Sequence, residues 1–256
     1  MELPDTTNIA IPKIIFQTWK TDQVPDKWKT SPESIRKYMP SWKYVLMTDR
    51  DNREFVKHNF PDFLPYYDKF EYPIQRADAI RYCLLYKFGG IYLDLDMELQ
   101  YPLDELFTSH KGLYFVNSSN VTSCLTNAFM ASIPEHPVWL DCIEAMKKPL
   151  PSWCVGKHWK VMMSTGPMML DQTVKGNRYE YVALPSLLLT PCSVCNLTCE
   201  ESKQAYIKPL PGSSWIGMDT TIYLFFMCNW KIIAIILFII FLILLILVIY
   251  FIFIKK

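Results

Sequence analysis

The sequence lacks an excess of basic charge. Without an apolar C-terminal run and its flanking lysines (Lys231, Lys255 and Lys256), 26 − 3 = 23 basic side chains stand against 25 acidic ones. Binding of nucleic acid needs a clustered positive field, so this chain is not expected to bind it. The first ten residues hold no apolar run and include the acidic Glu2 and Asp5, which argues against a signal peptide.

The longest apolar run fills residues 232–254, where no charged or strongly polar side chain occurs. A helix of this length measures about 35 Å, enough to cross a hydrocarbon core of about 30 Å. The sequence therefore predicts a globular domain over 1–230, a membrane-spanning helix over 231–254 and a short basic tail at 255–256. A single-pass C-terminal anchor of this kind predicts a location in the endomembranes, the ER or the Golgi.

Two orientations of the predicted domain stay open. Insertion through the C-terminal segment would leave residues 1–230 in the cytosol. Three glycosylation sequons, which begin at Asn117, Asn120 and Asn196, point instead toward a lumen. The lysines on the two sides of the apolar run differ too little in number to decide between the two orientations.

Eight cysteines include a tight cluster of Cys192, Cys195 and Cys199. The spacing is compatible with a structural zinc if a fourth ligand returns in space, with a disulfide inside the cluster, or with free thiols. The sequence leaves these three alternatives open.

The N-terminal part of the chain alternates between predicted strands and helices. Apolar runs at 13–17 and 44–47 are typical of short buried strands. Ser31 and Pro32 predict the N-cap and first position of a helix that ends at Tyr38. Two further helices are expected, at 50–59 and 61–69. This order predicts an α/β layer structure.

The most informative segment begins at Pro73. Apolar residues recur there with helical spacing until Gly89-Gly90 ends the pattern, so we expect a buried helix over 73–88. The strand expected at 91–93 runs directly into Asp94-Leu95-Asp96. This is the carboxyl end of a strand, where open α/β sheets bind ligands. The apolar positions of the helix are Ile74, Ala77, Ile80, Leu84, Leu85 and Phe88.

Asp94 and Asp96 are candidate metal ligands. Carboxylates at positions i and i+2 project from one side of an extended chain unless a turn intervenes. Two anions held so close repel, and a cation is needed to keep both ionised. Mg²⁺ or Mn²⁺ takes one or two carboxylates and adds water and substrate phosphates. An isolated D-x-D is more often a solvated acidic turn, but the helix, glycines and strand before this one favour the metal site.

Asp78 and Arg81 are spaced i, i+3 on the predicted helix and share one face. One interpretation is a local salt bridge of little energetic weight. The other is an acid and a guanidinium aimed together at a sugar and its phosphate, which arginine binds in bidentate fashion.

Three segments together resemble a known family. They are residues 11–19 (IPKIIFQTW), 76–82 (RADAIRY) and 87–96 (KFGGIYLDLD). Over about residues 11–108 the chain resembles the DXD sugar-binding region of glycosyltransferase family 32. That family includes the fungal initiating α-1,6-mannosyltransferase and the inositol-phosphoceramide mannosyltransferases, and it is related to the glucosyltransferase domains of the large clostridial toxins.

The resemblance implies a GT-A fold, which is a Rossmann-like mixed α/β sheet that binds a nucleotide sugar. It also implies a retaining transfer reaction that uses Mn²⁺ or Mg²⁺. The implied roles are base stacking for Trp19, contacts to sugar or ribose hydroxyls and phosphate for Asp78 and Arg81, a pocket wall for Tyr92, a ribose and sugar contact for Asp94, and metal coordination for Asp96.

A weaker likeness occurs at 164–167 (STGP) and at 212–215 (GSSW). In related enzymes such segments close the pyrophosphate and metal site, which implies donor contacts for Ser214 and Trp215. Many relatives have a histidine near the second segment and this chain has none. Ser214 or Asp219 is therefore the expected substitute at the metal.

The predicted function is a membrane-anchored, metal-dependent retaining hexosyltransferase. Leaving-group stabilisation by the metal and Arg81 would carry most of the catalysis. GDP-mannose is the favoured donor and a UDP-hexose the second choice, with a glycolipid or glycan as acceptor. The alternative is a catalytically inactive, tail-anchored protein that binds sugar nucleotides or glycans. Intact Asp78, Arg81, Asp94 and Asp96 favour the enzyme, because a binder released from catalysis need not keep all four.

Overall fold

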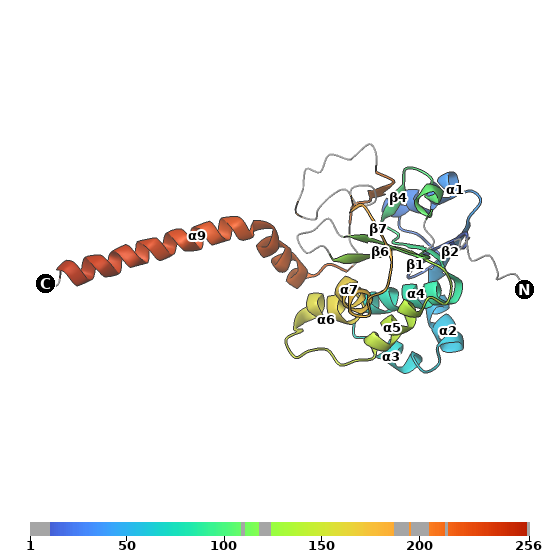
Figure 1. The fold of residues 1–256 in the computed structure, drawn as a ribbon, viewed down its shortest axis with the longest axis horizontal. Coiled ribbons are helices and arrows are strands. Elements are labelled where there is room, and N and C mark those ends of the chain that lie inside the picture. The colour runs from blue at the N-terminus through green and yellow to red at the C-terminus, as the bar shows by residue number, and fades with distance from the viewer. Residues whose placement is uncertain are drawn as a thin grey trace, which may run out of the picture. The chain divides into compact units, whose positions relative to one another are not determined.

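The structure is a computed structural model that describes residues 11–108, 111–117, 124–186, 195, 205–212 and 215–254. The chain divides into two units, Met1–Trp215 and Ile216–Lys256. The first unit contains a mixed sheet with helices, and the second contains one long helix (Figure 1).

Six strands form the main sheet of the first unit in the order β2-β1-β3-β6-β5-β7. β1 runs parallel to β2 and β3, β6 runs antiparallel to β3 and β5, and β7 runs parallel to β5. This mixed sheet confirms the predicted α/β fold class. The strands are β1 Ile14–Trp19, β2 Lys43–Thr48, β3 Gly90–Leu93, β5 Leu113–Asn117, β6 Leu125–Ser132 and β7 Val182–Leu184, and a second sheet pairs β4 Met97–Leu99 with β8 Ile207–Pro209.

Helices pack on both faces of the main sheet. Helices α2, α3, α4, α5 and α7 share a hydrophobic cluster with one face, and α1 shares a cluster with the other (Figure 1). The helices are α1 Thr30–Tyr38, α2 Asp49–Asn59, α3 Leu64–Lys69, α4 Pro73–Phe88, α5 Pro137–Met146, α6 Gly156–Ser164 and α7 Pro167–Gly176, with two short 3-10 helices at Asp26–Trp28 and Asp104–Leu106.

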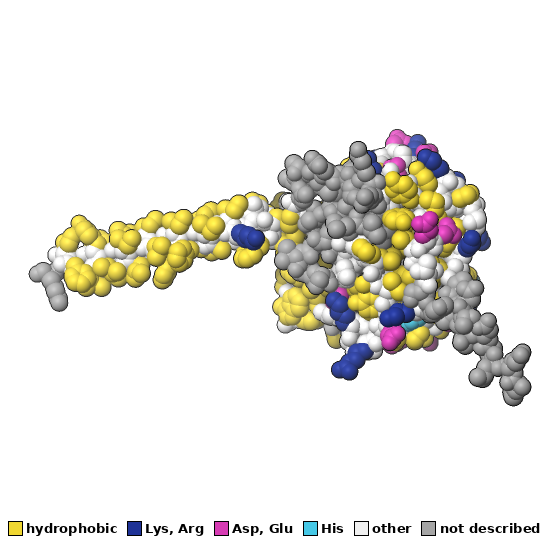
Figure 2. Space-filling model, turned by 45° about the horizontal axis from the view of Figure 1, so that its top comes forward, with side chains coloured by type: hydrophobic (Ala, Val, Ile, Leu, Met, Phe, Trp, Pro, Cys, Tyr) yellow, Lys and Arg dark blue, Asp and Glu magenta, His cyan; other side chains and the backbone are white. Residues whose placement is uncertain are grey.

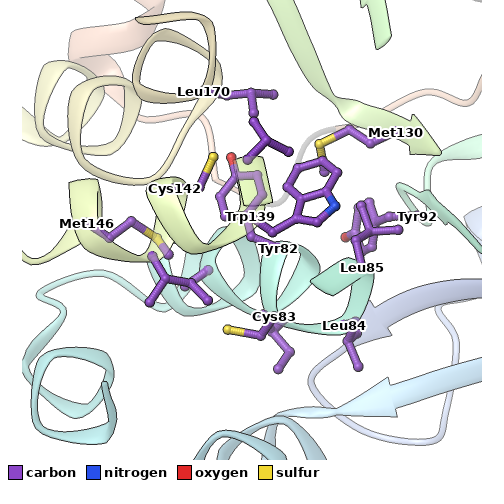
Figure 3. Packing of buried hydrophobic residues seen from close by; sticks show 14 of the residues in the cluster. Tyr82, Cys83, Leu84, Leu85, Tyr92, Met130, Trp139, Cys142, Met146 and Leu170 are labelled. Carbon is purple, nitrogen blue, oxygen red and sulfur yellow. The ribbon is translucent and has the colours of Figure 1, made fainter. Parts of the chain in front are cut away.

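The larger cluster is built around the contact between α4 and α5. The rings of Tyr82 and Trp139 stack with centroids 6.0 Å apart, and Phe115 of β5 packs edge-on against Trp139 (Figure 3). All three side chains are fully buried. Buried aromatic side chains contribute the largest areas to a core, so this cluster fixes α4 against the sheet.

Gly89 and Gly90 end α4 and begin β3 with positive φ angles of 62° and 87°. A Cβ on Gly90 would lie 2.5 Å from the carbonyl oxygen of Ile14, and one on Gly89 would lie 2.7 Å from that of Ser132. Glycine is therefore required at both positions, because only glycine combines this backbone with such close approach. The predicted limits of the helix, Pro73 and Phe88, are confirmed.

Two details of the predicted helices are wrong. Ser31 is not the N-cap of α1, which begins at Thr30; its hydroxyl instead donates to the carbonyl of Met97 at 2.5 Å. A tertiary partner thus replaces the local capping bond. On α4, Ile74 and Ala77 line a cavity instead of the core, and Phe88 is 43% exposed.

The second unit contains α9, Met218–Ile254, a helix long and apolar enough to cross a membrane. Hydrophobic side chains cover most of its visible face (Figure 2). The predicted segment 231–254 lies within this helix. The expected domain boundary at residue 230 stays a prediction, since the two units divide after Trp215.

The cysteines of the described residues fall into two groups. Cys195 and Cys228 each take part in a disulfide, whereas Cys83, Cys124, Cys142 and Cys154 are free thiols. The free-thiol alternative is therefore wrong for Cys195. Cys192 and Cys199 lie outside the described residues.

Candidate active site

A cavity of about 410 Å³ opens at the carboxyl ends of β1 and β3. Parallel strands deliver their last residues to one edge of a sheet, which is where α/β folds bind ligands. The cavity brings together seven of the predicted site residues, and they come from segments far apart in sequence. These residues are Trp19, Asp78, Arg81, Tyr92, Asp94, Asp96 and Trp215.

A tight turn connects Asp94 to Met97, whose N–H donates to the carbonyl of Asp94 at 3.2 Å. The Asp94 N–H donates to the carbonyl of Ala128 at 2.8 Å, and the Gln17 side-chain amide donates to the Asp94 carbonyl at 3.2 Å. Asp94 and Asp96 therefore lie on a turn held by β1 and β6. The expectation that both carboxylates project from one side of an extended chain therefore does not apply, because a turn intervenes.

The Asp94 carboxylate is held by two side chains. Its Oδ1 lies 3.1 Å from Nη1 of Arg81 and accepts a 3.0 Å hydrogen bond from the Tyr92 hydroxyl. Burial raises the pKa of Asp94, and the Arg81 guanidinium opposes this shift. Tyr92 is almost fully buried, so its hydroxyl acts on the site through Asp94.

Asp96 has no such partner among the described residues. Burial, together with the negative charge of Asp94, raises the pKa of Asp96 to about 7. A divalent cation would relieve this repulsion and favour the charged carboxylate. The described residues contain no group of three or more histidine, cysteine or acidic side chains that could hold a metal. Asp96 and Asp94 thus fit a cation that takes its remaining ligands from water and substrate phosphates.

Arg81 lies in a buried ion-pair network. Its Nη2 lies 2.9 Å from Oδ1 of Asp78, and its Nη1 donates to the carbonyl of Asn127 at 2.6 Å. Asp78 also accepts hydrogen bonds from the Asn127 amide at 3.1 Å and from the Thr165 hydroxyl at 3.0 Å. Burial raises the pKa of Asp78 to about 6 against the opposing effect of Arg81.

This network favours a positioning role for Asp78, because its carboxylate is already occupied by protein donors. Arg81 connects Asp78 to Asp94, and its guanidinium also lies 4.5 Å from the centroid of the Tyr92 ring. The Asp78–Arg81 pair is thus a salt bridge that borders the cavity, and its expected contact with a sugar and a phosphate stays a prediction.

Trp19, the last residue of β1, lines the cavity and comes from the other end of the sequence from Trp215. Its ring meets the buried Trp28 edge-on, with centroids 5.1 Å apart. The Trp28 indole N–H donates to the carbonyl of Pro211 at 3.1 Å, so Trp28 is itself fixed. Trp19 is half-buried and braced along its edge, which suits a face that stacks on a base.

Trp215 borders the cavity through contacts with α6. Lys157 Nζ donates to the Trp215 carbonyl at 2.6 Å, and the ring of His158 stacks on Trp215 at a centroid distance of 6.0 Å. Ser214 lies outside the described residues. Asp219 belongs to the second unit, so its predicted part in the metal site stays a prediction.

Sequence reasoning missed Asn127 and Lys157. Asn127 is a buried polar residue in β6, where the apolar Ala128, Phe129 and Met130 follow it, and a polar side chain in a buried strand is a recognisable signal. Lys157 carries no comparable signal, because only the packing of α6 brings it to the cavity.

The arrangement offers an aromatic ring, two carboxylates suited to a cation and a buried guanidinium around one opening. These groups match the base, pyrophosphate and sugar of a nucleoside-diphosphate sugar. A family profile described as "Glycosyltransferase sugar-binding region containing DXD motif" matches residues 25–113.

Individual relatives agree with this match. The chain is 34% identical to inositol phosphoceramide mannosyltransferase 3 of Schizosaccharomyces pombe over 90% of this chain and 63% of the relative. It is 38% identical to a mannosyl phosphorylinositol ceramide synthase of Saccharomyces cerevisiae over 63% of this chain and 41% of the relative. The chain therefore spans less than two thirds of the length of these fungal relatives.

A viral relative and a solved structure extend the comparison. An uncharacterized glycosyltransferase of Acanthamoeba polyphaga mimivirus is 31% identical, over 88% of this chain and 92% of the relative. The solved structure titled PaToxG Glycosyltransferase superposes with a TM-score of 0.50 at 17% identity, covering 65% of this chain and 69% of that one. This likeness supports the GT-A type of fold. The chain belongs to the family of glycosyltransferases that contain the DXD sugar-binding region.

Proposed function

We propose that the chain transfers a hexose, with mannose favoured, from a nucleotide sugar to a membrane glycolipid. The observation that carries the proposal is the placement of Asp94 and Asp96 on a fixed turn at the mouth of one cavity with Trp19. The names of the fungal relatives describe enzymes that transfer mannose to inositol phosphoceramide, which supports mannose as the sugar and a phosphoinositol lipid as the acceptor.

Each group has a part in binding the donor. Trp19 stacks on the base, and Asp94 and Asp96 hold Mn²⁺ or Mg²⁺ at the pyrophosphate. When bound, such a cation neutralises the charge that develops on the leaving nucleoside diphosphate. GDP-mannose is the favoured donor by family likeness, and a UDP-hexose is the second choice.

The chain's own residues position these groups. Arg81 holds the Asp94 carboxylate from one side and the Tyr92 hydroxyl holds it from another. The site is thus organised before the donor arrives, and groups fixed in advance stabilise developing charge most effectively. By family likeness the transfer retains the configuration of the sugar.

A donor screen tests the proposal. The full chain in lipid nanodiscs that contain phosphoinositol ceramide is given GDP-mannose, UDP-glucose or UDP-galactose, with Mn²⁺ or Mg²⁺. We expect a mannosylated lipid from GDP-mannose, and none from an Asp96→Ala variant. Donor binding without transfer or hydrolysis would support the inactive binding protein instead. Transfer from a UDP-hexose alone would correct the donor.

The membrane location is part of the same proposal. Helix α9 is the candidate anchor, and a lipid acceptor requires the cavity to work near a bilayer. Extraction of the full chain from cell membranes by detergent, but not by high salt or alkaline carbonate, is the expected result.

A further inference from the structure

The loop between α5 and α6, residues 147–155, exposes large apolar side chains. Trp153 is 56% exposed and Val155 is 73% exposed. Pro149 and Pro151 are exposed beside them. In Figure 1 this loop extends away from the helices on the lower left of the first unit. Contact between an exposed tryptophan side chain and water is unfavourable, and burial of that side chain in a membrane or against another surface would remove this contact.

The loop and the helix α6 that follows it contain lysines but no acidic residue. The segment from Ala145 to Leu170 contains four lysines and no acidic residue: Lys147, Lys148, Lys157 and Lys160. Lys147 pairs with Glu144 and Lys160 pairs with Glu71. Lys148 is exposed and has no ion pair among the described residues. The tip of the loop is therefore basic as well as apolar.

The loop is coupled to the cavity through α6. The Trp153 ring packs edge-on against Trp159, with centroids 5.9 Å apart. On the same helix, Lys157, Val161 and Met162 line the cavity. One short helix thus connects the apolar tip with the wall of the proposed donor site.

We propose that the 147–155 loop inserts Trp153 and Val155 into the interfacial region of a membrane, where Lys148 meets anionic headgroups. Tryptophan is enriched at this depth, since its ring is amphipathic. A lysine near an anionic surface is attracted to it electrostatically. Insertion would hold the cavity wall against the bilayer from which a lipid acceptor comes. This last consequence rests on the proposed function, whereas the insertion itself does not.

A bilayer fits these features better than a protein partner. A stable protein interface needs about 800 Å² on each side, whereas one tryptophan buries at most about 250 Å². A pair of apolar side chains is enough for interfacial insertion when a second membrane attachment exists. The candidate membrane helix α9 belongs to the same chain and provides that attachment.

Depth-dependent quenching tests the insertion. The full chain is reconstituted in vesicles of phosphatidylcholine with about 30% phosphatidylserine as the anionic lipid, with a fluorophore on Val155→Cys. We expect quenching by lipids spin-labelled near the headgroup, at least threefold stronger than for the same fluorophore on Glu33→Cys. Glu33 is exposed on α1, far from the loop in Figure 1. Equal quenching at the two positions overturns the proposal. This is also the result expected if a protein rather than the bilayer covers the loop.

A second measurement separates this proposal from the proposed function. In the Trp153→Ala, Val155→Ser double variant, quenching at a fluorophore on Lys148→Cys should fall at least threefold, whether or not the chain is active. With an active chain, we expect KM for a vesicle-embedded acceptor to rise roughly tenfold, while hydrolysis of the donor by water stays unchanged. The control Tyr101→Ser removes another exposed aromatic side chain and should change neither value. An unchanged quenching signal in the double variant contradicts the insertion.

Discussion

Nη1 of Arg81 lies 3.1 Å from Oδ1 of Asp94. Arg81 belongs to helix α4, whereas Asp94 belongs to the turn that follows strand β3. The contact makes the buried network of α4 continuous with the proposed metal site. A substitution at Arg81 should therefore lower both stability and activity, whereas one at Asp96, which lies outside the ion-pair network, should lower activity alone.

Asp96→Ala should abolish transfer and leave the fold intact. Asp96 is a cavity-lining carboxylate without an ion-pair partner among the described residues, so its loss would remove a proposed metal ligand and relieve repulsion with Asp94. Transfer at saturating Mn²⁺ and thermal unfolding are measured together. The control is Glu98→Gln, which changes a carboxylate two residues away that bonds Thr30. Wild-type turnover by the Asp96 variant would rule out the metal assignment.

Arg81→Lys should lower both activity and stability. Lysine keeps the charge but cannot reach Asp78, Asp94 and the Asn127 carbonyl at once, because it lacks the planar fork. We expect a rate loss of roughly 10- to 1000-fold and a decrease of about 1–3 kcal/mol in the free energy of unfolding. Full activity together with full stability would show that the network is not needed to position Asp94.

Thr165→Val should destabilise the chain by about 1–3 kcal/mol, since it leaves an oxygen of the buried Asp78 carboxylate with fewer donors. The control is Thr173→Val on α7, whose hydroxyl donates to the backbone carbonyl of Met169 and bonds the Cys142 thiol rather than a carboxylate. Unfolding by denaturant is followed in detergent for both. Equal stability of the two variants would contradict a structural role for the Thr165–Asp78 bond.

Trp19→Ala should weaken binding of the donor nucleotide roughly 10- to 100-fold, because stacking on a base contributes about 1–3 kcal/mol. Trp19→Phe should recover part of this loss. Calorimetric titration with the nucleoside diphosphate measures both. Unaltered Kd values in the alanine variant would remove Trp19 from the base site.

The disulfides at Cys195 and Cys228 favour the lumenal orientation, since disulfides persist in oxidising compartments. We expect a glycosidase-sensitive mobility shift when the full chain is expressed in a eukaryotic cell. Replacing Asn117, Asn120 and Asn196 by glutamine should remove the shift. The opposite result is a chain without glycans whose Cys195 reacts with a maleimide added to the cytosolic side of intact membrane vesicles. It would place the domain in the cytosol.

The sequence by itself determined the local parts of the site and the apolar helix. Helical spacing followed by Gly89-Gly90 identifies α4 and β3, because only glycine fits the backbone between them. A long apolar run identifies α9, because the composition of that segment alone predicts a membrane-spanning helix. The tertiary structure decided how these parts act. The turn at Asp94–Asp96 depends on hydrogen bonds to Gln17 and Ala128. Asn127 and Thr165 bond Asp78. Asn127 reaches it through the pairing of β3 with β6, and Thr165 reaches it from the C-terminal end of α6. Such contacts join residues distant in the chain, and no local pattern encodes them.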